Sequence, residues 1–358
     1  MEPHLERRGA RIAWALLAAW LAGCASMGPS TIARDRVDYD YAITTSWKRS
    51  MLLNMVKLRY ADTPMFLDVA SIINSYTIEG QVNAGINWPG GAAQGAASGF
   101  THYADKPTIT YNPLLGERFT RSLMTPMQPA VVVSLIQSGW SADMVMRMMV
   151  SSANGVDNRF GAGGRAHGAD PDFAQLTGAM RRIQASGAVG MRIQPDKGQD
   201  LTVLVLNRKD MPEDVARDIG TMRSILHIAP DAREIRVVYG SVPLGGEELA
   251  LVTRSMLEIL LDLASAIEVP ADDVRQGVAP APASFPEDGR GYQPLIRIHS
   301  GDAPPQRPFV AVPYQGHWFW IDESDYPSKG IFSFVMIIFS LMDTAAPKGQ
   351  PIVTVPAG

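Results

Sequence analysis

The most regular pattern of apolar and polar residues in the chain is a strict alternation over residues 75–88, SYTIEGQVNAGINW. One set of alternate positions is apolar or small: Tyr76, Ile78, Gly80, Val82, Ala84, Ile86 and Trp88. The other set contains Ser75, Thr77, Glu79, Gln81, Asn83, Gly85 and Asn87. Because successive residues of a strand lie on opposite faces, the pattern predicts a β-strand with one apolar face. We expect residues 105–113, DKPTITYNP, to form the returning strand after a flexible Gly/Ala loop over residues 89–99.

Two interpretations of this strand remain open. An apolar face with an aromatic residue at each end is typical of a transmembrane β-strand, which would turn part of that face toward lipid or a partner. The candidate residues for such contacts are Tyr76, Ile78, Val82, Ile86 and Trp88. An ordinary strand that covers a soluble core has the same pattern, and it would bury Ile78, Val82 and Ile86 within the monomer. The ordinary strand is favoured because Asp105 and Lys106 interrupt any apolar face of the expected partner strand.

The rest of the chain mixes helical and strand patterns. Trp47, Met51, Met55 and Leu58 recur at helical spacing, which predicts an amphipathic helix. Further helices are expected at about residues 116–123, 129–137, 141–152, 171–185, 212–227 and 251–267, and at 330–342 after Ser328 as its N-cap. Strands are expected at residues 189–194, 201–207, 234–240, 294–300, 309–314, 317–322 and 351–356. This order predicts an α+β fold: N-terminal helices with a β-hairpin, followed by a mixed α/β C-terminal region.

The N-terminal residues have the pattern of an export signal. Arg7, Arg8 and Arg11 precede an uncharged apolar run that ends at Ala22, too short for a membrane-spanning helix of about 20 residues. Leu21-Ala22-Gly23-Cys24 then resembles the lipobox of bacterial lipoprotein precursors. The resemblance implies that Cys24, the single cysteine, receives a diacylglycerol and an N-acyl chain after the preceding residues are removed. In Gram-negative members of that class an aspartate after the cysteine favours inner-membrane retention, so Ala25 implies the outer membrane.

The resemblance sets the expected organisation of the chain. Residues 1–23 are the signal peptide, 24–44 a polar tether, 45–158 a helical region with the hairpin, 159–170 a glycine-rich loop, and 171–358 an α+β domain. The full chain has 32 basic and 36 acidic residues, of which three and two precede Cys24, so the mature chain keeps 29 and 34 and a net charge of −5. That balance argues against nucleic-acid binding, which favours a basic surface.

Candidate chemistry is sparse. The densest polar and aromatic segment, HWFWIDESDYPSK, starts at His317 and contains Asp322, Glu323 and Asp325. A hydrolase-like enzyme could use His317 as a base with these carboxylates as partners, but a strand, a polar turn and a helix start explain the same residues. The mature histidines lack metal-ligand spacing, and MVMRMM (residues 144–149) is expected to pack in the core rather than to form a soft ligand surface.

These features predict a non-catalytic outer-membrane lipoprotein with a periplasmic body and a structural or assembly role. Its partners would be membrane lipid, through Cys24, and other envelope proteins, and no cofactor or metal is expected. Two alternatives remain: a ring-forming lipoprotein that contributes its β-hairpin to a membrane pore, and the hydrolase based on His317.

Overall fold

The computed structural model describes residues 27–73, 76–87, 94–105, 108–163, 166–196, 199–206, 212–283, 293–342 and 353–356. The chain divides into two compact units, Met1–Leu52 and Leu53–Gly358. Helix α2 (Met27–Arg59) crosses this boundary and includes the predicted helix around Met51 and Met55, both of which are buried. Residues 27–44, expected to be a tether, form the first half of the same helix. The lipobox residues and Cys24 lie outside the described residues.

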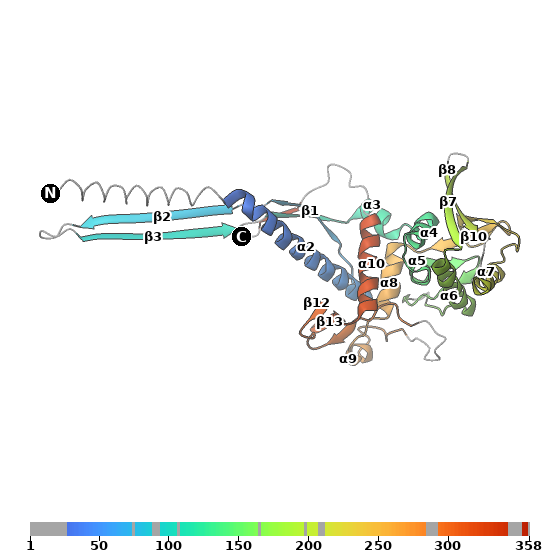
Figure 1. The fold of residues 1–358 in the computed structure, drawn as a ribbon. Coiled ribbons are helices and arrows are strands. Elements are labelled where there is room, and N and C mark those ends of the chain that lie inside the picture. The colour runs from blue at the N-terminus through green and yellow to red at the C-terminus, as the bar shows by residue number, and fades with distance from the viewer. Residues whose placement is uncertain are drawn as a thin grey trace. The chain divides into compact units, whose positions relative to one another are not determined.

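An antiparallel pair of strands contains the alternating segment. Strand β2 (Tyr76–Asn87) pairs with β3 (Gln94–Asp105), as Figure 1 shows, and β1 (Leu67–Ile73) pairs with β4 (Thr108–Pro113). The two pairs belong to separate sheets, β2-β3 and β1-β4-β14. In the second sheet, β14 (Val353–Pro356) adds to the free side of β4. The alternation therefore belongs to a two-stranded hairpin of twelve residue pairs.

The return strand begins earlier than the sequence suggested. Residues 94–99 were expected to be loop, but they pair residue by residue with β2 from Asn87 to Val82. Alanine and glycine have weak strand propensity, which is why QGAASG reads as a loop from sequence. In a ladder, pairing with the neighbouring strand decides the conformation, and the local preference is overridden.

A six-stranded mixed sheet, in the order β6-β5-β10-β9-β8-β7, forms the centre of the second half of the chain. Its strands are β5 (Val150–Ala153), β6 (Val156–Asp157), β7 (Val189–Asp196), β8 (Gln199–Leu206), β9 (Glu234–Tyr239) and β10 (Glu248–Thr253). Strands β9 and β10 are parallel, and the other neighbours are antiparallel. Helices α4 (Pro129–Gln137), α5 (Ala142–Met149), α6 (Pro171–Ser186) and α7 (Glu213–Ile225) pack beside one another and against this sheet (Figure 1).

The remaining described elements include a small antiparallel sheet, β11-β13-β12. Its strands are β11 (His299–Gly301), β12 (Pro308–Tyr314) and β13 (His317–Asp322). The other helices are α3 (Gly116–Phe119), the π-helical turn η1 (Thr120–Met124), α8 (Met256–Ser265), α9 (Ala271–Arg275) and α10 (Tyr326–Met342). Within the described ranges, no helix combines the length and the apolar character needed to cross a membrane. The α+β class expected from the sequence is confirmed.

Two segments expected to be wholly helical switch to strand. Residues 248–253 form β10, so the expected helix over 251–267 starts only at Met256, and the expected helix over 141–152 ends at Met149, where β5 begins. Five of the six β10 residues are buried. A strand buried on both faces is a continuous apolar run, which periodicity cannot distinguish from a buried helix.

The N-cap of α10 also differs from the expectation. Ser328 lies inside the first turn, and Asp325 occupies the capping position, where its Oδ1 accepts a hydrogen bond of 3.1 Å from the Ser328 N–H and its Oδ2 accepts one of 2.7 Å from Ser328 Oγ. Burial alone would raise the pKa of Asp325, but these two hydrogen bonds, together with nearby positive charge such as that of Arg297, outweigh it and hold the pKa below its usual value.

Replacement of Asp325 with alanine is expected to lower the free energy of unfolding by about 1 kcal/mol at neutral pH. A carboxyl with a lowered pKa stabilises the fold above its unfolded pKa, near 4, and loses that contribution as the pH falls through its folded value. Urea denaturation at pH 7 and pH 3 should therefore show a difference between wild type and D325A that shrinks at the lower pH. D325S, which keeps an acceptor, serves as the control, and an equal loss in both variants would contradict the capping role.

Candidate functional site

The strand that contains His317 does not bring it to the carboxylates that follow in the sequence. His317 and Asp322 lie at opposite ends of β13, and His317 Nδ1 is 3.9 Å from Asp302 Oδ1. Asp322 instead lies with its Oδ2 3.4 Å from His299 Nε2, and its Oδ1 accepts a hydrogen bond of 3.0 Å from Trp320 Nε1. The pairing on which the hydrolase alternative depends, His317 with Asp322, is not formed.

The other polar residues of this segment have structural partners. Lys329 Nζ donates a hydrogen bond of 2.9 Å to the backbone oxygen of Glu323 and also forms an ion pair with its carboxylate. Asp325 caps α10. Across the part of the chain that the structure describes, no group of three or more His, Cys, Asp or Glu side chains is arranged to hold a metal ion. Turn and cap contacts therefore account for the segment.

Two tyrosines next to carboxylates, Tyr60 and Tyr314, have raised pKa values. Tyr60 Oη donates a hydrogen bond of 2.6 Å to Asp273, Tyr314 Oη donates one of 2.8 Å to Asp62, and the two rings pack edge to face with centroids 5.3 Å apart. Burial, followed by the hydrogen bond to Asp273, raises the pKa of Tyr60, and burial with the bond to Asp62 raises that of Tyr314. A raised pKa keeps both phenols protonated at neutral pH, so they are donors and not bases.

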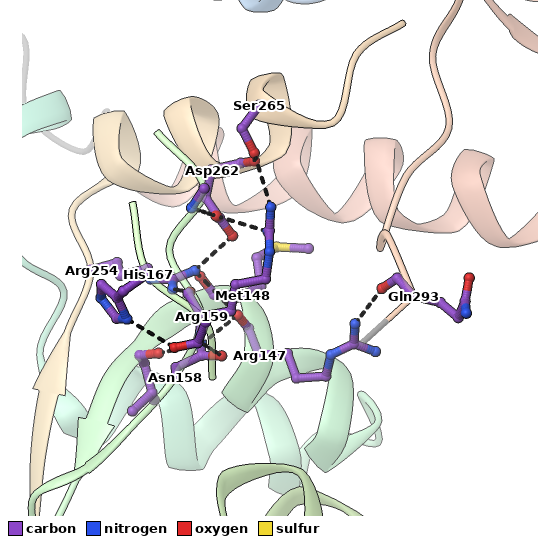
Figure 2. Close-up of polar contacts among 12 residues, drawn as sticks. Arg147, Met148, Asn158, Arg159, His167, Arg254, Asp262, Ser265 and Gln293 are labelled. Carbon is purple, nitrogen blue, oxygen red and sulfur yellow. Dashed lines mark hydrogen bonds and ion pairs between the residues drawn. The ribbon is translucent and has the colours of Figure 1, made fainter. Parts of the chain in front are cut away.

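A buried charged cluster, which sequence reasoning did not identify, lies between α8 and the loop after β6 (Figure 2). Figure 2 shows Asp262 and Ser265 on α8 directed toward Arg159. Asp262 Oδ2 accepts a hydrogen bond of 3.1 Å from Arg254 Nη1, and its Oδ1 lies 3.2 Å from Arg159 Nη1 and accepts one of 2.7 Å from the Gly161 N–H. The Arg254 side chain is only 1% exposed and that of Asp262 10%. One carboxylate thus joins two arginines and a backbone donor in the interior.

Backbone carbonyls complete the surroundings of Arg254. Its Nη1 donates to the Arg147 carbonyl at 3.2 Å, its Nη2 donates to the Arg159 carbonyl, and its guanidinium lies 5.5 Å from the centre of the Phe160 ring. A Cβ atom at Gly161 would lie 2.1 Å from Ser265 Oγ, so only glycine fits between the loop and α8. Hydrogen bonds and ion pairs of this cluster thus link α5, the loop after β6 and α8. An arginine in an apolar stretch, eight residues before an aspartate, was the only signal for it in the sequence.

The hairpin β2–β3 has the clearest division into two faces. Residues directly opposite each other in an antiparallel ladder share a face. The six apolar or small positions of β2, from Tyr76 to Ile86, face Asp105, Tyr103, Thr101, Gly99, Ala97 and Gly95 of β3 in that order. The polar positions, from Thr77 to Asn87, face Ala104, His102, Phe100, Ser98, Ala96 and Gln94. Opposite the apolar positions of β2, β3 therefore has small or uncharged residues from Gly95 to Tyr103, whereas Phe100 lies opposite Gln81 on the polar face.

The register also shows where Asp105 lies relative to the apolar positions of β2. The sequence suggested that this residue interrupts the apolar face, but Asp105 pairs with Tyr76 at the end of the ladder. The apolar positions from Ile78 to Ile86 are opposite Tyr103, Thr101 and small residues. Lys106 and Trp88 lie outside the described residues. The predicted burial of Ile78, Val82 and Ile86 concerns side chains that are also outside the described part of the structure. At Asp105 the interruption of the apolar face is therefore confined to the last pair of the hairpin.

Comparison with models of protein families, with curated protein sequences and with solved structures finds no match to the chain. The geometry of the chain itself is therefore the basis for a functional proposal.

The buried cluster makes a stability prediction. Replacement of Asp262 with alanine leaves Arg254 buried without its counter-charge, which is expected to lower the free energy of unfolding by about 3–5 kcal/mol. The matched control is D218A, because Asp218 pairs with Arg182, whose side chain is 60% exposed, and such pairs contribute about 0–1 kcal/mol. Urea denaturation of both variants is the measurement. A similar loss in the two would show that the buried pair contributes no more than a surface pair.

Proposed function

We propose that this chain is a lipid-anchored subunit of a ring, in which each copy contributes its β2–β3 hairpin to a shared pore across the outer membrane. In this proposal, acyl chains on Cys24 hold the chain at the membrane and the α+β body lies in the periplasm. The body has no catalytic role. The single observation that carries the proposal is a twelve-pair hairpin in which the apolar positions of β2 from Ile78 to Ile86 lie opposite uncharged residues of β3.

Length and composition support a membrane-spanning hairpin. A transmembrane β-strand needs about 9–11 residues, and β2 and β3 each have 12. Strands of this kind alternate between lipid-facing apolar and lumen-facing polar residues, with aromatic residues near the interfaces. Tyr76 and Tyr103 lie near one end of the apolar face, and Trp88 follows β2 at the other end in the sequence.

The unpaired edges support a ring rather than a lone hairpin. In the described part of the chain, β2 and β3 pair only with each other, so each has one edge without a neighbouring strand. A two-stranded hairpin is marginally stable in water, and in lipid each unpaired backbone group costs several kcal/mol. Hairpins from neighbouring copies would satisfy both edges at once, and a closed ring would leave none unpaired.

The structural or assembly role ranked first on sequence grounds requires the hairpin to cover the protein's own core. On sequence grounds it was favoured by the interruption at Asp105 and Lys106, and Asp105 belongs to the last pair of the β2–β3 hairpin. The pore is therefore the better-supported of the two functions, and the structural role is the alternative that the hairpin variants test.

Replacement of Val82 with arginine is expected to abolish membrane insertion, because a charge at the middle of a lipid-facing strand costs about 2–4 kcal/mol in each copy of the ring. The matched control is N83R, one residue along on the polar face, which should insert and change the ion selectivity of the pore. Conductance in planar bilayers and the native mass of the complex are the measurements. If V82R conducts like wild type, or if wild type forms no oligomer and no conductance, the pore proposal fails.

The anchor is tested separately by Cys24→Ser. Without the thiol, no acyl chain can be attached, so we expect unprocessed precursor and no incorporation of labelled palmitate. Mass spectrometry of the mature N-terminus gives an independent check. A mature chain that begins at another residue, or unchanged membrane association of C24S, would contradict lipidation at Cys24.

A further inference from the structure

A cavity of about 270 Å³ lies between the six-stranded sheet and the helices that pack against it. Helices α4, α5, α6 and α7 line it on one side, and strands β7, β8, β9 and β10 on the other. Protein interiors have few voids larger than a water molecule. A space of this size at the centre of a sheet–helix interface is therefore a feature that packing alone does not explain.

The interior of the cavity is apolar. Its wall includes Val133, Ile183, Leu204 and Leu251, together with the methionines Met146, Met180 and Met222, whose flexible side chains adapt to irregular apolar ligands. Aspartate, glutamate, lysine, arginine and histidine are absent from the lining residues that the structure describes. The part of a ligand that enters this space must itself be uncharged and apolar.

The polar side chain nearest the interior is already fully engaged. Gln184 Nε2 donates hydrogen bonds of 2.7 Å to the carbonyls of Ile136 and Trp140, and its Oε1 accepts one of 2.8 Å from the Ala142 N–H. It has no donor hydrogen left for a ligand. The rim consists of exposed positions at the helix ends, Gln137, Gly139 and Gly187. A polar head group would therefore remain outside, in water, while an apolar tail enters.

Cavity volume sets the length of that tail. An apolar cavity of about 150 Å³ accepts a six-carbon benzene ring, so 270 Å³ corresponds to about ten carbon atoms. We propose that this cavity binds a single acyl chain of about ten carbons, from a free fatty acid or from a lipid whose head group stays at the rim. This site is separate from the hairpin and does not depend on the pore proposal.

The test is equilibrium dialysis of radiolabelled decanoate against the full chain in digitonin, a detergent without an alkyl chain. We expect one decanoate per chain. Hexanoate should bind about two orders of magnitude more weakly, because each methylene removed from an apolar site weakens binding about fourfold. Competition by didecanoyl phosphatidylcholine would assign the site to lipid acyl chains, and no competition would assign it to free fatty acids.

Variants that fill the cavity locate the binding. Met180→Trp on α6 and Val189→Phe on β7 introduce bulk from opposite walls, and each should weaken decanoate binding at least tenfold. Ala185→Trp adds the same side chain to an exposed position of α6 outside the cavity and should bind as wild type does. Melting curves without ligand establish that each variant is folded. Because M180W and V189F fill the cavity from different walls, one of them still tests the proposal if the other does not fold. No saturable decanoate binding, or equal binding in folded M180W, V189F and wild type, would overturn the proposal.

Discussion

Arg254 lies buried where β10 ends and α8 begins, and the segments around it depend on the hydrogen-bond requirement of its guanidinium. Its backbone N–H donates to the Met149 carbonyl at 2.8 Å, and its carbonyl accepts from the Met127 N–H at 3.2 Å. The side chain reaches Asp262 on α8 and the Arg159 carbonyl of the loop. A buried charge is tolerated only when it is paired and hydrogen-bonded. The positions of α5, α8 and the loop after β6 are thus coupled through one residue, whose loss would affect all of them.

Elements with a clear local pattern could be predicted from the sequence. Apolar periodicity correctly predicted the helix around Met55 and the strand from Tyr76, and a proline marked the start of the helix at Pro129. Strand β10 could not be recognised, because burial on both faces removes its alternation. The early start of β3 is decided by pairing with β2, which no local preference of QGAASG encodes.

The candidate site could be predicted only in part, for a related reason. Alternation identified one strand of the hairpin, but the face of a hairpin is a property of two strands in register, and register depends on pairing between distant residues. The same limit applies to Asp262, whose partners Arg159 and Arg254 are 103 and eight residues away in sequence. His317 shows the reverse case: proximity in sequence to Asp322 suggested a pair, while an extended strand separates the two.

The pairing of β1 with β4 contains one irregularity, between Val69 and Ser71, where β1 has one more residue than β4. On one side of it Ile72 lies opposite Ile109, and on the other side Val69 lies opposite Tyr111. Since Ile109 and Tyr111 share a face of β4, the extra residue acts as a phase shift that keeps Leu67 and Val69 on the face of Ile72. Strand β1 therefore tolerates changes of composition more readily than changes of length. A single residue inserted into it would exchange the two faces of the strand beyond that point, whereas two would leave them in place.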